Sequence, residues 1–474
     1  MKKFEIISKT YIYILVVLLL LGCKKFIEVD APSTSINTEQ VYKNDATAAA
    51  ALTAIYIQLS QGDVTPGNGL TSVSIDCGLY ADELDYTRNV QNINSLLWTN
   101  SLTSTNGIQD DWRNIYNKIY QSNSAIEGLK HSNSLSADVK NQLLGEAIFI
   151  RGFCYFYLTN MFGSVPLAVT TDYKVNSLLS RSNQSDVYKQ ILNDFTAADS
   201  LLSSNYVGGD GKTPTSERVR PCKAAAEAML ARVYLYTKNF RQAEIFASKL
   251  INNSLTYDLV SVEDVFLKNS RETIWSIPSV NTSTAANTAE GRAFILSSTT
   301  NALAGPPYSL TSVVLNSFEP GDLRKLKWTG ADLAQNSTRY DFVYKYKVGA
   351  DLKPTMEYSI VLRLAEMYLI RAEARAMQNN LSEARDDLNT IRHRAGLLDV
   401  NAPDQDSFLN AVVQERQVEL FAEWGHRFFD LKRLGILEKL AMEKPQSWTA
   451  TDQNFPIPQG DRDKDPNLSQ NDGY

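Results

Sequence analysis

Apolar residues recur at helical spacing over much of the chain. Trp112, Ile115 and Ile119, for example, follow one another at intervals of three and four positions, the period of a helix with one buried face. Gly163 and Pro166 close another such segment, because glycine and proline interrupt helices. The pattern predicts four long helices in the first half of the chain, over residues 45–59, 110–129, 139–162 and 185–202.

Two later segments share one pattern, a helix, a short polar turn and a second helix. In the first, Ala231 precedes Ala243 by twelve positions, and in the second Ala372 precedes Ala384 by the same interval. Small residues at these places let two helices cross closely, as in tetratricopeptide repeats, although neither copy carries the full consensus. We therefore predict two helical pairs, over residues 224–251 and 363–392.

The region between the two repeats has a different composition. Residues 280–310 are low in charge and rich in Ser, Thr, Asn and Gly, which is typical of loops. The short runs ETIWSIP and DFVYKYKV alternate apolar and polar residues like small strands. We expect a loop-rich insertion at about 260–350, with a minor β component at the edge of a helical body.

The N-terminus resembles an export signal. Lysines precede an apolar run from Tyr11 to Gly22, which is shorter than the roughly 20 residues needed to cross a bilayer. Cys23 follows Gly22 directly, as in the bacterial lipobox, whose cysteine is acylated and becomes the first residue of the mature chain. We expect a removed signal peptide, a lipidated tether and a folded body, at residues 1–22, 23–44 and 45–474.

Charge and motif spacing exclude several classes of function. A net charge of −6 leaves no basic surface to neutralise nucleic-acid phosphates, so we expect no nucleic-acid partner. The three histidines lack the spacing of zinc sites. In DRDKDP the aspartates have calcium-loop spacing but a proline stands where the loop needs glycine, which leaves calcium as a weak alternative. Glu415, Glu419 and Glu423 recur every four residues, which favours charge pairs on one helix face over acid/base chemistry. We assign no catalytic residue, metal or cofactor.

Two tryptophans lie in polar, turn-rich surroundings, Trp98 in NINSLLWTNSLTSTNG and Trp328 in LKWTGADLAQNS. An exposed ring beside amides and hydroxyls suits the flat face of a sugar. The alternative is that each ring packs under its own loop. The candidate ligand-binding residues are Trp98, Trp328, Tyr86, Arg88, Asn100 and Tyr308.

Four longer motifs, taken in order, resemble one known family. They are GEAIFIRGFCYFYLTNMFGSVPL, VLRLAEMYLIRAEARA with SEARDDLNTIRHRAGL, ERQVELFAEWGHRFFDLKRLG, and the ending FPIPQGDRDKDPNLSQNDGY. Their order and spacing are similar to those of the SusD/RagB family of Bacteroidetes outer-membrane lipoproteins, and the resemblance runs from Cys23 to Tyr474.

This resemblance implies an all-α body of tetratricopeptide-like helix pairs with an irregular loop-rich subdomain, and no catalytic activity or cofactor. It implies a palmitate-type anchor on Cys23 that holds the protein at the outward face of the outer membrane. There it would bind oligosaccharides and deliver them to a SusC-like TonB-dependent transporter. A peptide-binding member of the family and a helical scaffold without a ligand are the alternatives. Ligand residues in the family come from variable loops, so no motif assigns Trp98 or Trp328.

Overall fold

The computed structural model describes residues 38–60, 70, 72–106, 108–280, 287–296, 307–333, 339–349 and 354–474. Cys23 and the predicted signal peptide lie outside these residues, as does most of the predicted tether, so the assignments made there stay predictions. In the part of the chain that is described, no helix is both long enough and apolar enough to cross a membrane.

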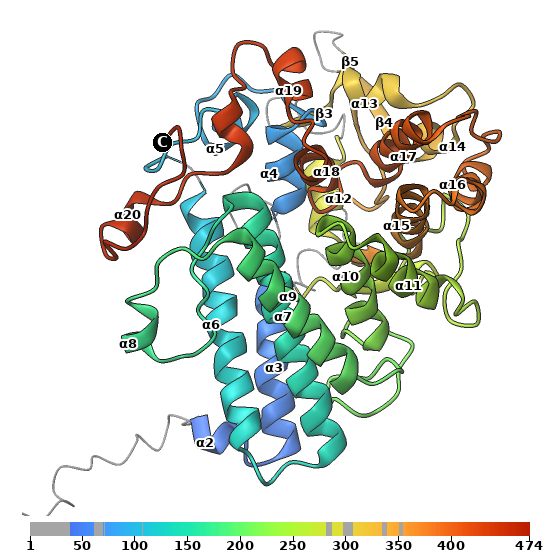
Figure 1. Cartoon of the computed structure of the whole chain (residues 1–474). Coiled ribbons are helices and arrows are strands. Elements are labelled where there is room, and N and C mark those ends of the chain that lie inside the picture. The colour runs from blue at the N-terminus through green and yellow to red at the C-terminus, as the bar shows by residue number, and fades with distance from the viewer. Residues whose placement is uncertain are drawn as a thin grey trace, which may run out of the picture.

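The body is predominantly helical, which confirms the predicted fold class (Figure 1). In its N-terminal half the described helices are α2 (Thr38–Val41), α3 (Asp45–Ser60), α4 (Val73–Tyr80), α5 (Ile93–Trp98), α6 (Gln109–His131), α7 (Ala137–Phe162), α8 (Tyr173–Asn176), α9 (Gln184–Leu201), α10 (Lys223–Tyr236) and α11 (Phe240–Ile251). The later ones are α12 (Ala289–Phe294), α13 (Ser312–Ser317), α14 (Leu323–Trp328), α15 (Leu364–Met377), α16 (Leu381–Arg394), α17 (Gln405–Leu420), α18 (His426–Arg433), α19 (Glu438–Glu443), the 3-10 helix η3 (Ala450–Gln453) and α20 (Gln459–Arg462).

The four long helices predicted in the first half are α3, α6, α7 and α9, and they form one bundle. Helix α7 lies at its centre in contact with the other three, and nearly all of its side chains after Gln142 are buried. It ends at Gly163, whose φ of 77° is a left-handed conformation that suits glycine. A Cβ there would also lie only 2.8 Å from Oδ1 of Asn454, so the Asn454 side chain would have to shift to admit another residue.

The two predicted repeats are the helical pairs α10–α11 and α15–α16. The four alanines that defined them are fully buried, which is why the helices of each pair can approach closely (Ala231, Ala243, Ala372 and Ala384). Helix α11 packs against α15, so the two pairs stack although a long loop-rich region separates them in sequence. This arrangement confirms the tetratricopeptide-like prediction.

The described strands form three small antiparallel pairs. Both predicted strand segments contribute, since ETIWSIP contains β2 and DFVYKYKV overlaps β5. The pairs are β1 (Leu84–Tyr86) with β3 (Tyr308–Leu310), β2 (Thr273–Ile277) with β6 (Ser359–Arg363), and β4 (Thr329–Leu333) with β5 (Arg339–Val343).

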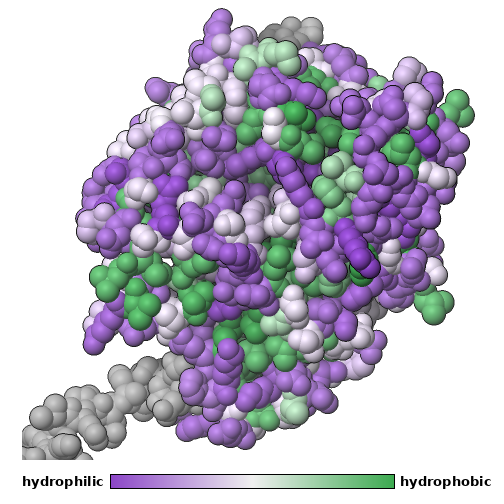
Figure 2. Space-filling model, in the orientation of Figure 1, coloured by the Kyte–Doolittle hydropathy of each residue, from purple (hydrophilic) through white to green (hydrophobic). Residues whose placement is uncertain are grey.

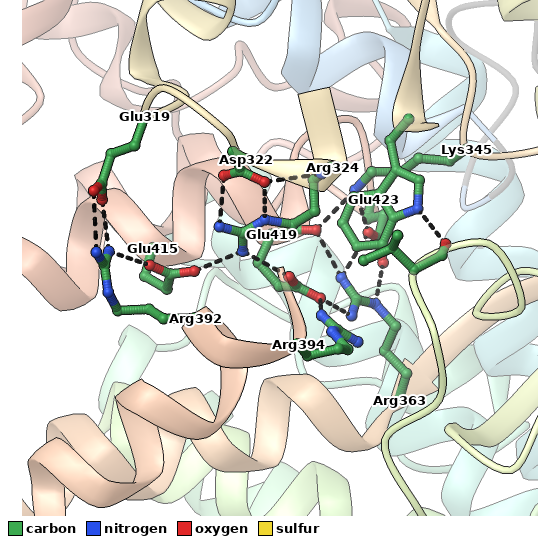
Figure 3. A network of polar contacts seen from close by, with 12 residues as sticks. Glu319, Asp322, Arg324, Lys345, Arg363, Arg392, Arg394, Glu415, Glu419 and Glu423 are labelled. Carbon is green, nitrogen blue, oxygen red and sulfur yellow. Dashed lines mark hydrogen bonds and ion pairs between the residues drawn. The ribbon is translucent and has the colours of Figure 1, made fainter. Parts of the chain in front are cut away.

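A network of buried ion pairs ties the C-terminal helices to the strands (Figure 3). Arg363, at the end of β6, is its most connected member. Its Nη1 donates to Glu272 at 2.9 Å and to Glu419 at 2.5 Å, and its Nε donates to Glu423 at 2.8 Å. Buried charges destabilise a fold unless they are paired, and each of these carboxylates has a basic partner.

The network corrects the expectation that Glu415, Glu419 and Glu423 share one helix face. Helix α17 ends at Leu420, and the chain then turns through residues with positive φ before α18 begins. Glu423 therefore faces Lys345 and Arg363 in the interior and pairs with neither a helical neighbour nor solvent. Four-residue spacing in the sequence predicted a continuous helix and did not indicate that α17 ends at Leu420.

Candidate ligand-binding site

A pocket of about 470 Å³ opens beside Trp98. Four segments far apart in the sequence build it: the start of β1, the end of α5, the junction of β3 with α13, and the turn after α19. Its lining residues are Asp82, Asp85, Trp98, Thr99, Thr311, Ser312, Val313, Glu443, Lys444, Pro445, Gln446 and Ser447. Pockets of this size bind small ligands in other proteins, and this one combines a large aromatic ring with several polar groups.

Trp98 is the last residue of α5 and is 37% exposed. Asn92 caps the helix, with its side chain accepting from the backbone N–H groups of Asn94 and Ser95. The indole Nε1 of Trp98 donates to Oδ1 of Asp85 at 3.2 Å, which fixes the orientation of the ring. The structure thus presents one fixed aromatic ring to the pocket with a carboxylate at its edge.

Tyr86 and Tyr308 support this helix and do not line the pocket. They are paired across β1 and β3, and both side chains are buried. The Tyr86 hydroxyl accepts from Nδ2 of Asn92 at 2.8 Å, and the Tyr308 hydroxyl donates to Oδ1 of Asn94 at 2.7 Å. The structure therefore gives both tyrosines a positioning role at the start of α5, where sequence analysis expected ligand contacts.

Asn100 and Lys444 hold the far end of α5. Asn100 is buried with a φ of 49°, and its Nδ2 donates to the carbonyl of Tyr80 at 2.8 Å. The amino group of Lys444 donates to the carbonyls of Leu79 and, at 3.0 Å, Trp98. Burial lowers the pKa of Lys444 to about 7, while nearby carboxylates act in the opposite direction. Asn100 is thus part of the scaffold, away from the pocket surface.

The expectation that Trp328 is an exposed ring is wrong. Its side chain is fully buried, and its Nε1 donates to the carbonyl of Val262 at 2.7 Å. Lys345, Arg363 and Arg394 lie 4.9, 5.9 and 5.7 Å from its ring centroid, so Trp328 covers the ion network and offers no face to a sugar. Helix α14 turns Trp328 inward while Leu326 remains exposed, so the polar sequence around Trp328 did not indicate an exposed ring.

Arg88 is half-buried and does not line the Trp98 pocket. Of the predicted ligand residues, the structure brings only Trp98 to that pocket. Sequence reasoning missed Asp85, Lys444 and the segment 311–313, because they lie in ordinary polar stretches with no motif. They can be recognised as pocket residues only in the folded structure, where they lie close together.

Within the described residues, no group of three or more His, Cys, Asp or Glu side chains is arranged to hold a metal ion. The three described cysteines, Cys77, Cys154 and Cys222, are buried and free. Burial raises the pKa of the Cys154 thiol to about 12, so it is not a reactive nucleophile at neutral pH.

Comparisons with known proteins agree with this architecture. A family model described as "Starch-binding associating with outer membrane" matches residues 25–235, and a model of the SusD family matches residues 324–474. Two SusD-like proteins from Formosa agariphila are 24% and 26% identical to this chain. The alignments cover 91% and 92% of this chain, and 90% and 91% of the relatives.

Solved structures share the fold over nearly the whole chain. A SusD superfamily protein from Bacteroides vulgatus aligns with a TM-score of 0.79 at 24% identity, covering 91% of this chain and 100% of that one. Surface glycan-binding protein A from Bacteroides thetaiotaomicron, solved in complex with laminarihexaose, aligns with a TM-score of 0.76 at 18% identity, covering 90% and 99% of the two chains. With two family models and relatives matched over most of their length, this chain belongs to the SusD/RagB family.

Proposed function

We propose that this protein is a non-catalytic, lipid-anchored protein of the cell surface that binds oligosaccharides in the Trp98 pocket. It delivers them to a SusC-like TonB-dependent transporter in the outer membrane. The observation that carries the proposal is the fixed, partly exposed Trp98 ring in a pocket that also presents carboxylate, hydroxyl and amide side chains. A ring of this kind covers the apolar face of a sugar while polar neighbours bind its hydroxyl groups.

Relatives support the ligand class. One structural neighbour is described as a laminarin-binding SusD-like protein, and another was solved with laminarihexaose. Their TM-scores of 0.75 and 0.76 establish the shared fold, but at identities of 20% and 18% the glycan bound here is a separate question.

The ligand proposal is tested with residues 24–474, purified without lipid, in calorimetric titrations against a panel of oligosaccharides. For the sugar that binds, Trp98→Ala is expected to weaken binding by about 1–3 kcal/mol, the cost of truncating an aromatic anchor. Tyr173→Ala is the matched control, because this ring is 73% exposed on α8 and does not line the pocket. Apolar side chains gather at the left edge of Figure 2, on the side where Figure 1 places α8. Unchanged affinity in Trp98→Ala would overturn the site assignment.

The anchor is tested by fractionating cells that express the full chain. Cys23→Ser is expected to move the protein from the membrane fraction to the soluble one, because a serine cannot take the thioether-linked lipid. The transporter should co-purify with the wild-type protein after detergent extraction. A variant that stays in the membrane fraction would refute lipidation at Cys23.

A further inference from the structure

The charged groups around the Trp98 pocket are unequally neutralised. Asp82 is buried, and both of its oxygens accept from Arg427, at 2.8 and 2.7 Å. Asp85 and Glu443 also line the pocket, and among the described residues neither forms a salt bridge. The pocket therefore presents two carboxylates that form no salt bridge with another described residue, although Asp85 lies close enough to Lys444 to raise the pKa of its amino group.

Lys444 is the one basic residue among the described residues that line the pocket. Its amino group donates to backbone carbonyls of α4 and α5, those of Leu79 and Trp98 among them, and so points into the protein. Burial lowers the pKa of this amino group to about 7, against the opposing effect of Asp82 and Asp85. Besides Asp82, which is paired with Arg427, the lining holds two carboxylates and one amine, so acidic groups are in excess.

Asp85 is placed where it meets any sugar that stacks on the indole. Its Oδ1 lies 3.2 Å from Nε1 of Trp98, at the edge of the aromatic face. A sugar hydroxyl that reaches this edge can donate a charge-assisted hydrogen bond to the carboxylate. A uronate or sulfate group at the same place would bring a second negative charge into a partly desolvated site, which Coulomb repulsion opposes.

We propose that the Trp98 pocket selects neutral oligosaccharides and rejects acidic ones, with Asp85 and Glu443 as the specificity-determining residues. This inference rests on the proposed function, since it specifies the ligand of the same site. The proposal specifies only the charge of the ligand. The linkage and the monosaccharide depend on which hydroxyl groups the pocket binds.

The test is a titration series at low salt with neutral oligosaccharides and with two kinds of acidic probe. The acidic probes are the same neutral chains oxidised at C6 to uronates, and oligogalacturonate. A neutral chain is expected to bind at least about tenfold more tightly than its oxidised form, a difference that shrinks at high salt as the repulsion is screened. An acidic probe that binds as tightly as the neutral chain, or more tightly, would overturn the inference. If Trp98→Ala abolishes that binding, the proposed function still stands.

Charge-neutral variants locate the effect. Asp85→Asn keeps an oxygen acceptor for the Trp98 indole and removes the charge, and Glu443→Gln does the same at the rim. Each is expected to raise affinity for the oxidised chain several-fold, about tenfold in the double variant. Glu438→Gln, on the same helix as Glu443 but outside the pocket lining, is the matched control and should leave the ratio unchanged. No gain in Asp85→Asn would overturn the inference, and no binding of any probe would refute the proposed function with it.

Discussion

The Trp98 pocket and the ion network covered by Trp328 contain the same kinds of residue, an aromatic ring with carboxylates and basic groups beside it. They differ in burial and in how completely the charges are paired. The Trp328 ring is fully buried and its neighbouring charges are joined in a continuous network (Figure 3). Trp98 is partly exposed, and within the described part of the chain the lining carboxylates Asp85 and Glu443 form no salt bridge. Extensive pairing suits the first region to a structural role, whereas the proposed ligand site keeps polar groups that are accessible from the pocket.

The largest effect expected in this comparison is the loss of stability when the cation at the centre of the network is removed. Arg363→Met is expected to lower the free energy of unfolding by about 5 kcal/mol, because Glu272, Glu419 and Glu423 lose a buried partner. Urea unfolding monitored by circular dichroism measures it. An exposed arginine supplies the control: Arg113→Met removes a solvent-exposed pair and should change stability by less than about 1 kcal/mol. Equal midpoints for the two variants would contradict the scaffold interpretation.

The two tryptophans should respond differently to the same truncation. Trp328→Ala is expected to destabilise the fold by about 4 kcal/mol, since it leaves a cavity and exposes the network to water. Trp98→Ala should cost about 1 kcal/mol of stability, because part of the ring already faces solvent, and its main effect should be on ligand affinity. Thermal or urea unfolding gives the stability difference. A similar loss in both variants would show that the rings do not differ in role.

The smallest of the three effects concerns acid pH. Burial alone would raise the pKa of Glu419, but Arg394, Arg363 and Arg324 hold it well below its usual range. A depressed pKa in the folded state contributes stability above the unfolded pKa of about 4.3, and this is lost as pH falls further. Glu419 should therefore account for about 2 kcal/mol of stability lost between pH 6 and pH 3.

The measurement is the urea midpoint of the wild type and of Glu419→Gln across that range. The variant starts less stable, because three arginines lose an anionic partner, and its decline toward acid pH should be shallower. Glu383→Gln, a largely exposed carboxylate on α16, should follow the wild-type slope. Parallel curves for wild type and Glu419→Gln would show that Glu419 keeps an ordinary pKa.

Helices were the most predictable part of this protein. The spacing of Trp112, Ile115 and Ile119 indicated the buried face of α6, and the alanines of α10–α11 and α15–α16 indicated close packing. In each case the information lies within one or two turns of the same helix. The end of α17 was not predictable, because it depends on Glu423 meeting Arg363 and Lys345 from distant segments.

The sequence by itself determined the helical repeats, the small strands, the acidic balance and the motifs that mark the family, because these depend on residues close together in the chain. Only the tertiary structure decided between Trp98 and Trp328. Both stand among polar residues, but α14 turns Trp328 into the ion network, while α5 presents Trp98 beside Asp85 and the turn that carries Lys444. Burial and the neutralisation of charge depend on groups that meet only when the chain has folded, so local sequence cannot report them.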